Sequence, residues 1–276
     1  MAAWGSFELR ADRNVPLLRE KCYEAASEFT PESLLREARR QKQLPHAALP
    51  PVCVLDPDGD IVRYLRTIGS ATIDPTWACY HSELYRFEQQ GQEFGIVGCA
   101  VGASYAVLVA EQMFASRCEL LVSITSSGQI TSLAPPPYFI LSERALRDEG
   151  TSYHYLPPSD YAEADPALID AIWPKLSAAG EPMKRGGTWT TDAPFRETSV
   201  AIEAARSKGL LAVEMEASAL YAFAQAGGHA VICFAHVTNQ MGQAEGDFEK
   251  GEENGAVAAI ELIAAIGRAW GGLPGD

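Results

Sequence analysis

The chain has 276 residues, of which 47% are hydrophobic and 21% are charged, so it can bury one large core without disulfides or metals. Its 22 Lys and Arg against 36 Asp and Glu give a formal net charge of −14, a balance that would repel a nucleic-acid backbone. We therefore expect a globular protein that does not bind nucleic acid.

The first fifty residues are polar and predict a helical extension over residues 1–50. Thr30 is expected to cap a helix that begins at Pro31, and the basic run 36–42 is interpreted as the solvated face of that helix. The start of the chain carries acidic and basic residues where a signal peptide would need an apolar run. This pattern favours a cytoplasmic protein.

Short apolar runs recur after residue 50, and each ends in small or polar residues. They lie at 52–55, 94–101, 120–124 and 230–237. Runs of this kind predict buried strands of a largely parallel sheet, with helical segments between them, such as 105–115 and 216–226. The alternation indicates an α/β domain over residues 51–270, in which the polar loops after the four strands gather at one edge.

Three sequence features argue against a disulfide-bonded protein, a metalloprotein and a membrane protein. The six cysteines form no CxxC motif and are expected to be buried thiols, without disulfides. The five histidines form no HxxxH or HxH pair, so no metal site is predicted. The stretch from Ala256 to Ile266 is interrupted by Glu261 and is too short to cross a bilayer, so no membrane partner is expected.

The segment 213–221, which reads VEMEASALY, is the most informative in the chain. If it is extended, Glu214 and Glu216 share one face and Met215 points to the other. If a helix starts at Glu216, the helix dipole favours the ionised carboxylate, which can accept two hydrogen bonds from a vicinal diol. A third interpretation is a surface helix start with two solvated glutamates.

This segment resembles the signature of the nucleoside phosphorylase and nucleosidase family, which includes the uridine phosphorylases. Further segments agree in order and rough spacing, so the resemblance covers roughly residues 50 to 268. It implies a single α/β domain with a mixed, twisted central sheet flanked by helices. It also implies that Met215 packs beside a ribose, that Glu216 binds the ribose hydroxyls, and that Glu214 belongs to the same substrate-binding group.

The segment 187–198, which reads GTWTTDAPFRET, resembles the family's base-binding segment. The resemblance implies that Phe195 and Arg196 bind the base, Phe195 by stacking on it. Alternatively, Arg196 pairs with Glu197 or Asp192 and only stiffens the loop.

Asn239 follows the last predicted strand, at the place where adenine-handling members of the family have an acid. An amide cannot donate a proton to a departing base, but it can hydrogen-bond a carbonyl or an N–H on that base. The resemblance therefore implies an oxo-purine or a pyrimidine nucleoside as the substrate.

The segment from Gly59 to Arg63 keeps the Gly, Asp and Arg of the family's phosphate loop. The resemblance implies that Gly59, Arg63, Thr125 and Ser126 place phosphate against the anomeric carbon. Two further family arginines are lost. One falls on Ser123, and the other, which a neighbouring subunit donates, falls near residues 80 and 81.

The function implied is cleavage of a nucleoside N-glycosidic bond by phosphorolysis, which yields free base and ribose 1-phosphate. Glu216, Asn239 and Arg63 would be the catalytic residues, with phosphate as co-substrate and no other cofactor. Loss of the arginine at Ser123 keeps a nucleosidase, in which water replaces phosphate, as the alternative. A nucleoside-binding protein without turnover is the third. The resemblance also implies a homo-oligomer.

Overall fold

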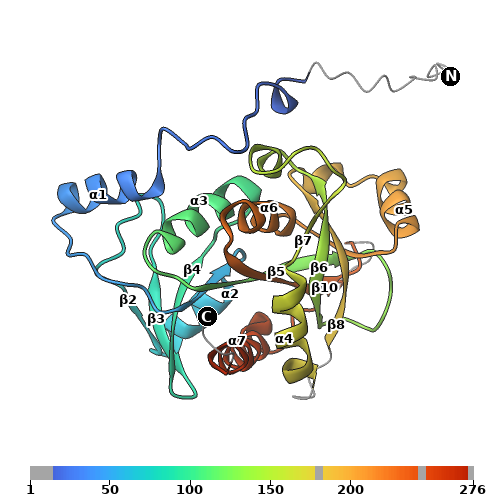
Figure 1. Ribbon diagram of the computed structural model, residues 1–276. Coiled ribbons are helices and arrows are strands. Elements are labelled where there is room, and N and C mark those ends of the chain that lie inside the picture. Colours follow the sequence, from blue (N-terminus) through green and yellow to red (C-terminus); the bar gives the residue numbers. More distant parts are fainter. Residues whose placement is uncertain (1–14, 178–182, 242–246, 273–276) are drawn as a thin grey trace.

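One mixed sheet of ten strands forms the centre of the molecule, and helices cover both of its faces (Figure 1). A computed structural model describes residues 15–177, 183–241 and 247–272. The strands are β1 (Val52–Asp56), β2 (Ala71–Ile73), β3 (Tyr85–Gln89), β4 (Gln92–Gly98), β5 (Leu120–Gln129), β6 (Tyr138–Asp148), β7 (Tyr161–Glu163), β8 (Met183–Thr191), β9 (Leu210–Glu214) and β10 (Ala230–Asn239).

The helices form two main packed pairs. On one side α3 packs on α6, and on the other α4 packs on α7. The α-helices are α1 (Pro31–Lys42), α2 (Asp60–Thr67), α3 (Ala103–Phe114), α4 (Pro166–Ser177), α5 (Ser199–Ser207), α6 (Ala217–Gly227) and α7 (Ala256–Gly271). The 3₁₀ turns are η1 (Pro16–Leu18), η2 (Thr151–His154), η3 (Pro194–Arg196) and η4 (Glu252–Gly255).

The four apolar runs predicted as strands form β1, β4, β5 and β10, which lie parallel to one another. Their carboxyl ends therefore meet at one edge of the sheet, as predicted. Antiparallel pairs such as β6 with β10 and β3 with β4 make the sheet mixed, which confirms the expected fold class.

The loop predicted after residue 124 is wrong, because β5 continues to Gln129. Its parallel ladder with β10 extends through Thr125, Ser126 and Ser127, and this ladder satisfies backbone groups that a loop would leave to water. Thr125 and Ser126 therefore lie on a strand, where successive side chains point to opposite faces.

The edge of β5 opposite β10 has two successive partner strands. β1 pairs with it only as far as Ser123, and β9 pairs with it only from Gly128. β5, β10, β6, β8 and β9 consequently pair in a closed cycle, while β1, β4, β3 and β2 continue the sheet outward from β5. The backbone between Ser123 and Gly128 faces the gap where β1 and β9 diverge.

The N-terminal extension is helical in α1 and in the short turn η1, and residues 19–30 between them are irregular. Thr30 caps α1 as predicted, since its Oγ1 accepts a hydrogen bond from the Ser33 amide at 3.2 Å, and Pro31 is the first helical residue. Leu35 and Ala38 pack with Ala78 in a small cluster of their own. Residues 1–14 of the predicted extension lie outside the described part of the chain.

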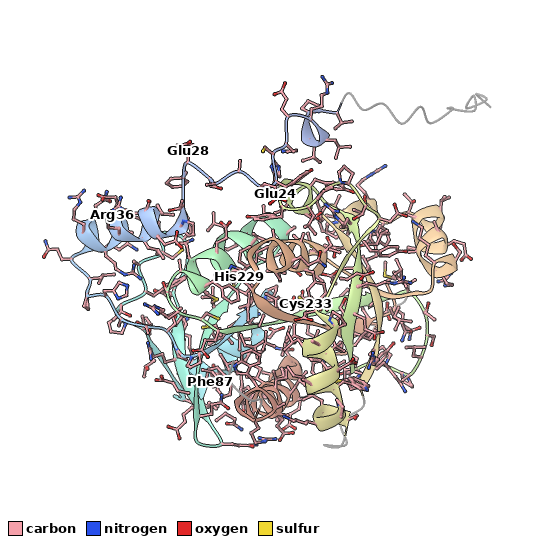
Figure 2. All side chains as sticks on the ribbon, in the orientation of Figure 1. Glu24, Glu28, Arg36, Phe87, His229 and Cys233 are labelled. Carbon is pink, nitrogen blue, oxygen red and sulfur yellow. The ribbon has the colours of Figure 1, made fainter. Side chains whose placement is uncertain are left out.

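The six cysteines are all free, in agreement with the sequence, but two of them are exposed. Cys22 lies in the irregular part of the extension, and Cys99 follows β4 at the edge where the strands end. The expectation of burial is therefore wrong for these two thiols. Cys233 lies in the interior, whereas Glu28 and Arg36 lie on the extension (Figure 2).

None of the helices in the described residues is long and apolar enough to cross a bilayer. The C-terminal apolar stretch forms part of α7.

Candidate functional site

Glu216 reaches the edge where the parallel strands end. β9 stops at Glu214 and Glu216 stands at the N-cap of α6, so the helix-start alternative is the one observed. Its Oε1 accepts a hydrogen bond of 2.7 Å from the amide of Gly102, in the loop after β4. The carboxyl thus joins the start of α6 to that loop, and the half-buried Met215 lies next to it.

Burial decides the protonation of Glu216. The side chain is only 1% exposed, and this burial, together with the negative charge of Glu214, raises the pKa of Glu216 to about 8. The helix start favours the ionised form, but burial outweighs it. In the free protein the carboxyl is therefore largely protonated at pH 7, and partners that donate hydrogen bonds would favour its ionisation.

Glu214 has its hydrogen-bonding capacity used inside the protein. Its Oε1 accepts from the hydroxyls of Thr190, at 2.5 Å, and Thr188, at 3.2 Å. Its Oε2 accepts from the backbone amides of Glu216 and Ala217, both at 2.7 Å. Glu214 therefore caps the first turn of α6 and fixes the position of Glu216, rather than offering free oxygens to a substrate.

Gly59 precedes α2 at the end of β1, with a φ of 74° that favours glycine. A Cβ at this position would lie 2.6 Å from the Cys99 sulfur, so a larger residue would also clash. The buried Asp56 holds the turn, because it accepts hydrogen bonds from the amides of Gly59 at 3.1 Å and Val62 at 2.9 Å.

The two cations of this turn are both engaged by Asp60. Arg63 donates from Nη2 to Asp60 Oδ1 at 2.6 Å and to the carbonyl of Asp58 at 2.8 Å. Lys250 binds Asp60 Oδ2 at 2.7 Å from a loop 190 residues further along the chain. Lys250 was not predicted, because nothing in the sequence relates it to a turn so far away along the chain.

Asp58 is a second residue of this turn that was not predicted from the sequence. Its Oδ2 accepts from the amide of Ser126 at 2.7 Å, and its Oδ1 accepts from the Ser126 hydroxyl, also at 2.7 Å. A cavity of about 20 Å³ beside it is lined by Asp56, Asp60, Thr125 and His236, among others. The sequence signal that could have identified Asp58 is the spacing of three aspartates, at 56, 58 and 60, directly after a buried strand.

The predicted base-binding residues are exposed to solvent. Phe195, in η3, is fully exposed, and Arg196 beside it is exposed as well. Among the described residues Arg196 forms no ion pair with Glu197 or Asp192, and Asp192 instead accepts a hydrogen bond from the Gly150 amide. The structure therefore does not bring Phe195 and Arg196 into contact with Glu216.

Asn239 ends β10, at the same edge as Glu216. Its Oδ1 accepts from the Met241 amide at 2.9 Å, and its Nδ2 donates to the Thr238 hydroxyl at 3.2 Å. These bonds fix which end of the amide is the donor.

No group of three or more His, Cys, Asp or Glu side chains in the described parts of the chain is arranged to hold a metal ion. The site consists of carboxyl, hydroxyl, amide and two cationic groups.

The pH dependence of stability provides a test of the buried turn. Burial, with smaller contributions from the charges of Asp58 and Asp60, raises the pKa of Asp56 to about 7. Such a group stabilises the fold below its ordinary pKa near 4, and that contribution is lost as the pH rises through about 7. We expect Asp56→Asn to lack this loss, so that its free energy of unfolding minus that of wild type increases, by up to about 1.4 kcal/mol per pH unit, as the pH rises over this range.

Urea denaturation at pH 4.5, 5.5, 6.5 and 7.5 measures this effect. Asp170→Asn, which removes an exposed carboxylate on α4, is the matched control. A difference between Asp56→Asn and wild type that is the same at every pH, or an equal slope in the control, would contradict the assignment.

Comparison with known proteins gives one family and one fold. A family model described as the phosphorylase superfamily matches residues 56–269. No curated protein matches the chain.

Two solved structures of uridine phosphorylase from Vibrio fischeri ES114 are similar to this chain, each at 20% sequence identity. One, complexed with 6-hydroxy-1-naphthoic acid, has a TM-score of 0.64 over 83% of this chain and 91% of that chain. The other has a TM-score of 0.65 over 83% of this chain and 94% of that chain. At this identity the similarity is one of fold.

Proposed function

The chain belongs to the phosphorylase superfamily, and from this premise we propose that it cleaves the N-glycosidic bond of a nucleoside. The observation that carries the proposal is the buried carboxyl of Glu216, which stands where the parallel strands end and is positioned by Glu214 and Gly102. When ionised, it can accept hydrogen bonds from both hydroxyls of a ribose. Met215, next to it, would pack on the sugar.

Asn239, Phe195 and Arg196 are the residues that we propose to contact the base. Asn239 lies at the edge shared with Glu216 and offers hydrogen bonds but no acidic proton. We therefore propose oxo-purine or pyrimidine nucleosides as substrates. Phe195 and Arg196, both exposed in the free protein, would cover the base when it binds.

Phosphate is the proposed nucleophile, so the products would be free base and ribose 1-phosphate. Gly59, Arg63, Thr125 and Ser126 lie around one turn at the strand ends, and a glycine turn with one guanidinium is suited to an oxyanion. We further propose that the working form is a homo-oligomer, which light scattering coupled to size-exclusion chromatography would test.

Hydrolysis is the second candidate, and Asp58 is the observation that favours it. Its carboxylate already accepts from the backbone amide and the hydroxyl of Ser126. The adjoining cavity of about 20 Å³ has room for about one water molecule. Water could reach this place without displacing any group of the protein.

Incubation with uridine, inosine, guanosine and adenosine, with and without phosphate, tests both candidates. Chromatography would follow the free base and the sugar product. Phosphate-dependent formation of ribose 1-phosphate supports phosphorolysis, whereas free ribose at a rate indifferent to phosphate supports hydrolysis. No release of base from any of these nucleosides would contradict the proposed function.

Asn239→Asp tests the assignment of the base. Aspartate keeps the oxygen that accepts from Met241 and adds a carboxyl that can protonate a departing 6-aminopurine. We expect the ratio of kcat/KM for adenosine to that for inosine to rise by about tenfold or more, since positioned acids contribute at least that much. A wild-type enzyme that already prefers adenosine, or an unchanged ratio in the variant, would show that Asn239 does not face the base.

A further inference from the structure

Ser126 presents two hydrogen-bond donors at a break in the sheet. β1 pairs with β5 up to Ser123, and β9 pairs with it from Gly128, so the Ser126 amide lies between two successive partner strands. An N–H in that position has to find a partner other than a strand. Its own hydroxyl points to the same partner, because both groups donate to Asp58.

The carboxylate of Asp58 binds Ser126 in the way that an external oxyanion would. Each of its oxygens accepts one hydrogen bond of 2.7 Å, one from the backbone and one from the hydroxyl. Its side chain is 28% exposed, and the Lys250 ammonium lies 3.9 Å from Oδ1. Asp58 thus supplies a negative charge and two acceptor oxygens to donors suited to a bound anion.

The two cations nearest to Ser126 already have partners within the protein. Arg63 and Lys250, the cations of this turn, are both paired with Asp60. The cavity beside Asp58 holds about 20 Å³, which is room for about one water molecule. A phosphate ion could use the Ser126 donors only if the Asp58 side chain moved away.

We propose that Asp58 is an internal competitor for the oxyanion and sets how tightly phosphate binds at Ser126. With Asp58 in place, phosphate must displace a like charge from its two hydrogen bonds before it can make its own. Asp58 then determines how far phosphate is favoured over water as the nucleophile. The inference rests on the proposed function, but phosphate binding itself can be measured without a nucleoside.

Direct binding of inorganic phosphate to the full-length protein, measured by isothermal titration calorimetry without nucleoside, tests the inference. Asp58→Ala removes the charge and opens space, and we expect it to bind phosphate at least about tenfold more tightly than wild type. Asp170→Ala removes an exposed carboxylate on α4 and should bind as wild type does, which controls for net charge. Adding Ser126→Ala to Asp58→Ala should reverse most of the gain.

Equal phosphate affinity in wild type and Asp58→Ala would overturn the inference, as would an equal gain in Asp170→Ala or a gain that survives Ser126→Ala. Asp58→Asn, which keeps the shape of the side chain, takes the place of Asp58→Ala if that variant fails to fold. Tighter phosphate binding together with no cleavage of any nucleoside would support the role of Asp58 and refute the proposed function. Failure of the inference about Asp58 and failure of the proposed function are therefore distinguishable.

Discussion

Replacement of Glu216 by glutamine is expected to lower kcat/KM for the preferred nucleoside by about one to two orders of magnitude. The amide still accepts the hydrogen bond from Gly102 but cannot become the anion that receives two sugar hydroxyls. Charge-assisted hydrogen bonds of this kind contribute about 1.5–3 kcal/mol, which gives the expected loss of rate. Melting temperature should change little, because the bonds that hold the start of α6 come from Glu214.

The pH profile distinguishes this role from a purely structural one. Since burial raises the pKa of Glu216 to about 8, the ionised form becomes populated only as the pH rises through that value. Wild-type kcat/KM should therefore increase between about pH 7 and 9, and Glu216→Gln should not show that increase. Glu88→Gln, an exposed position on β3, is the control. Near-wild-type kinetics in Glu216→Gln would remove this residue from the site.

Glu214→Ala is expected to act on stability, lowering the free energy of unfolding by about 3 kcal/mol or more. It leaves the amides of Glu216 and Ala217 and the hydroxyls of Thr188 and Thr190 without their acceptor in a buried place. Urea denaturation at pH 7 measures the loss.

Glu203→Ala is the matched control for that loss. Glu203 pairs with Arg206 on the surface of α5, so its removal should cost less than about 1 kcal/mol. A loss below about 1 kcal/mol in Glu214→Ala would mean that the acceptor is dispensable. Substitutions of the two glutamates are thus expected to differ in effect: at Glu214 they lower stability, and at Glu216 they lower turnover.

The sequence predicted the strands that periodicity and turn residues mark most clearly. β1, β4, β5 and β10 are apolar because both of their faces are covered, and they run parallel to one another. The end of β5 could not be predicted from composition. Thr125 and Ser126 are typical of a loop, and they are kept extended by the ladder with β10, where they pair with Ala235 and His236.

The candidate site was predictable where one short segment carries it. Glu216 and Met215 belong to a motif of nine residues, and the structure brings Glu216 to the strand ends. The contacts made by the turn that holds Asp56, Asp58 and Asp60 were not predictable in the same way. The pairing of Asp58 with Ser126 joins residues 68 apart in the chain, and the pairing of Asp60 with Lys250 joins residues 190 apart. The spacing of the three aspartates marks an acidic turn, but it does not identify the distant residues with which they pair.

The order in which the chain is synthesised has a consequence for β10. This strand lies between β5 and β6 in the closed cycle, yet it is made after every other strand of the sheet. Until β10 emerges from the ribosome, β5 and β6 each expose an unpaired edge, which is a template for pairing with another chain. Nascent chains that end before residue 230 should therefore be prone to aggregate and to bind chaperones, and emergence of β10 should close the cycle and remove both exposed edges at once.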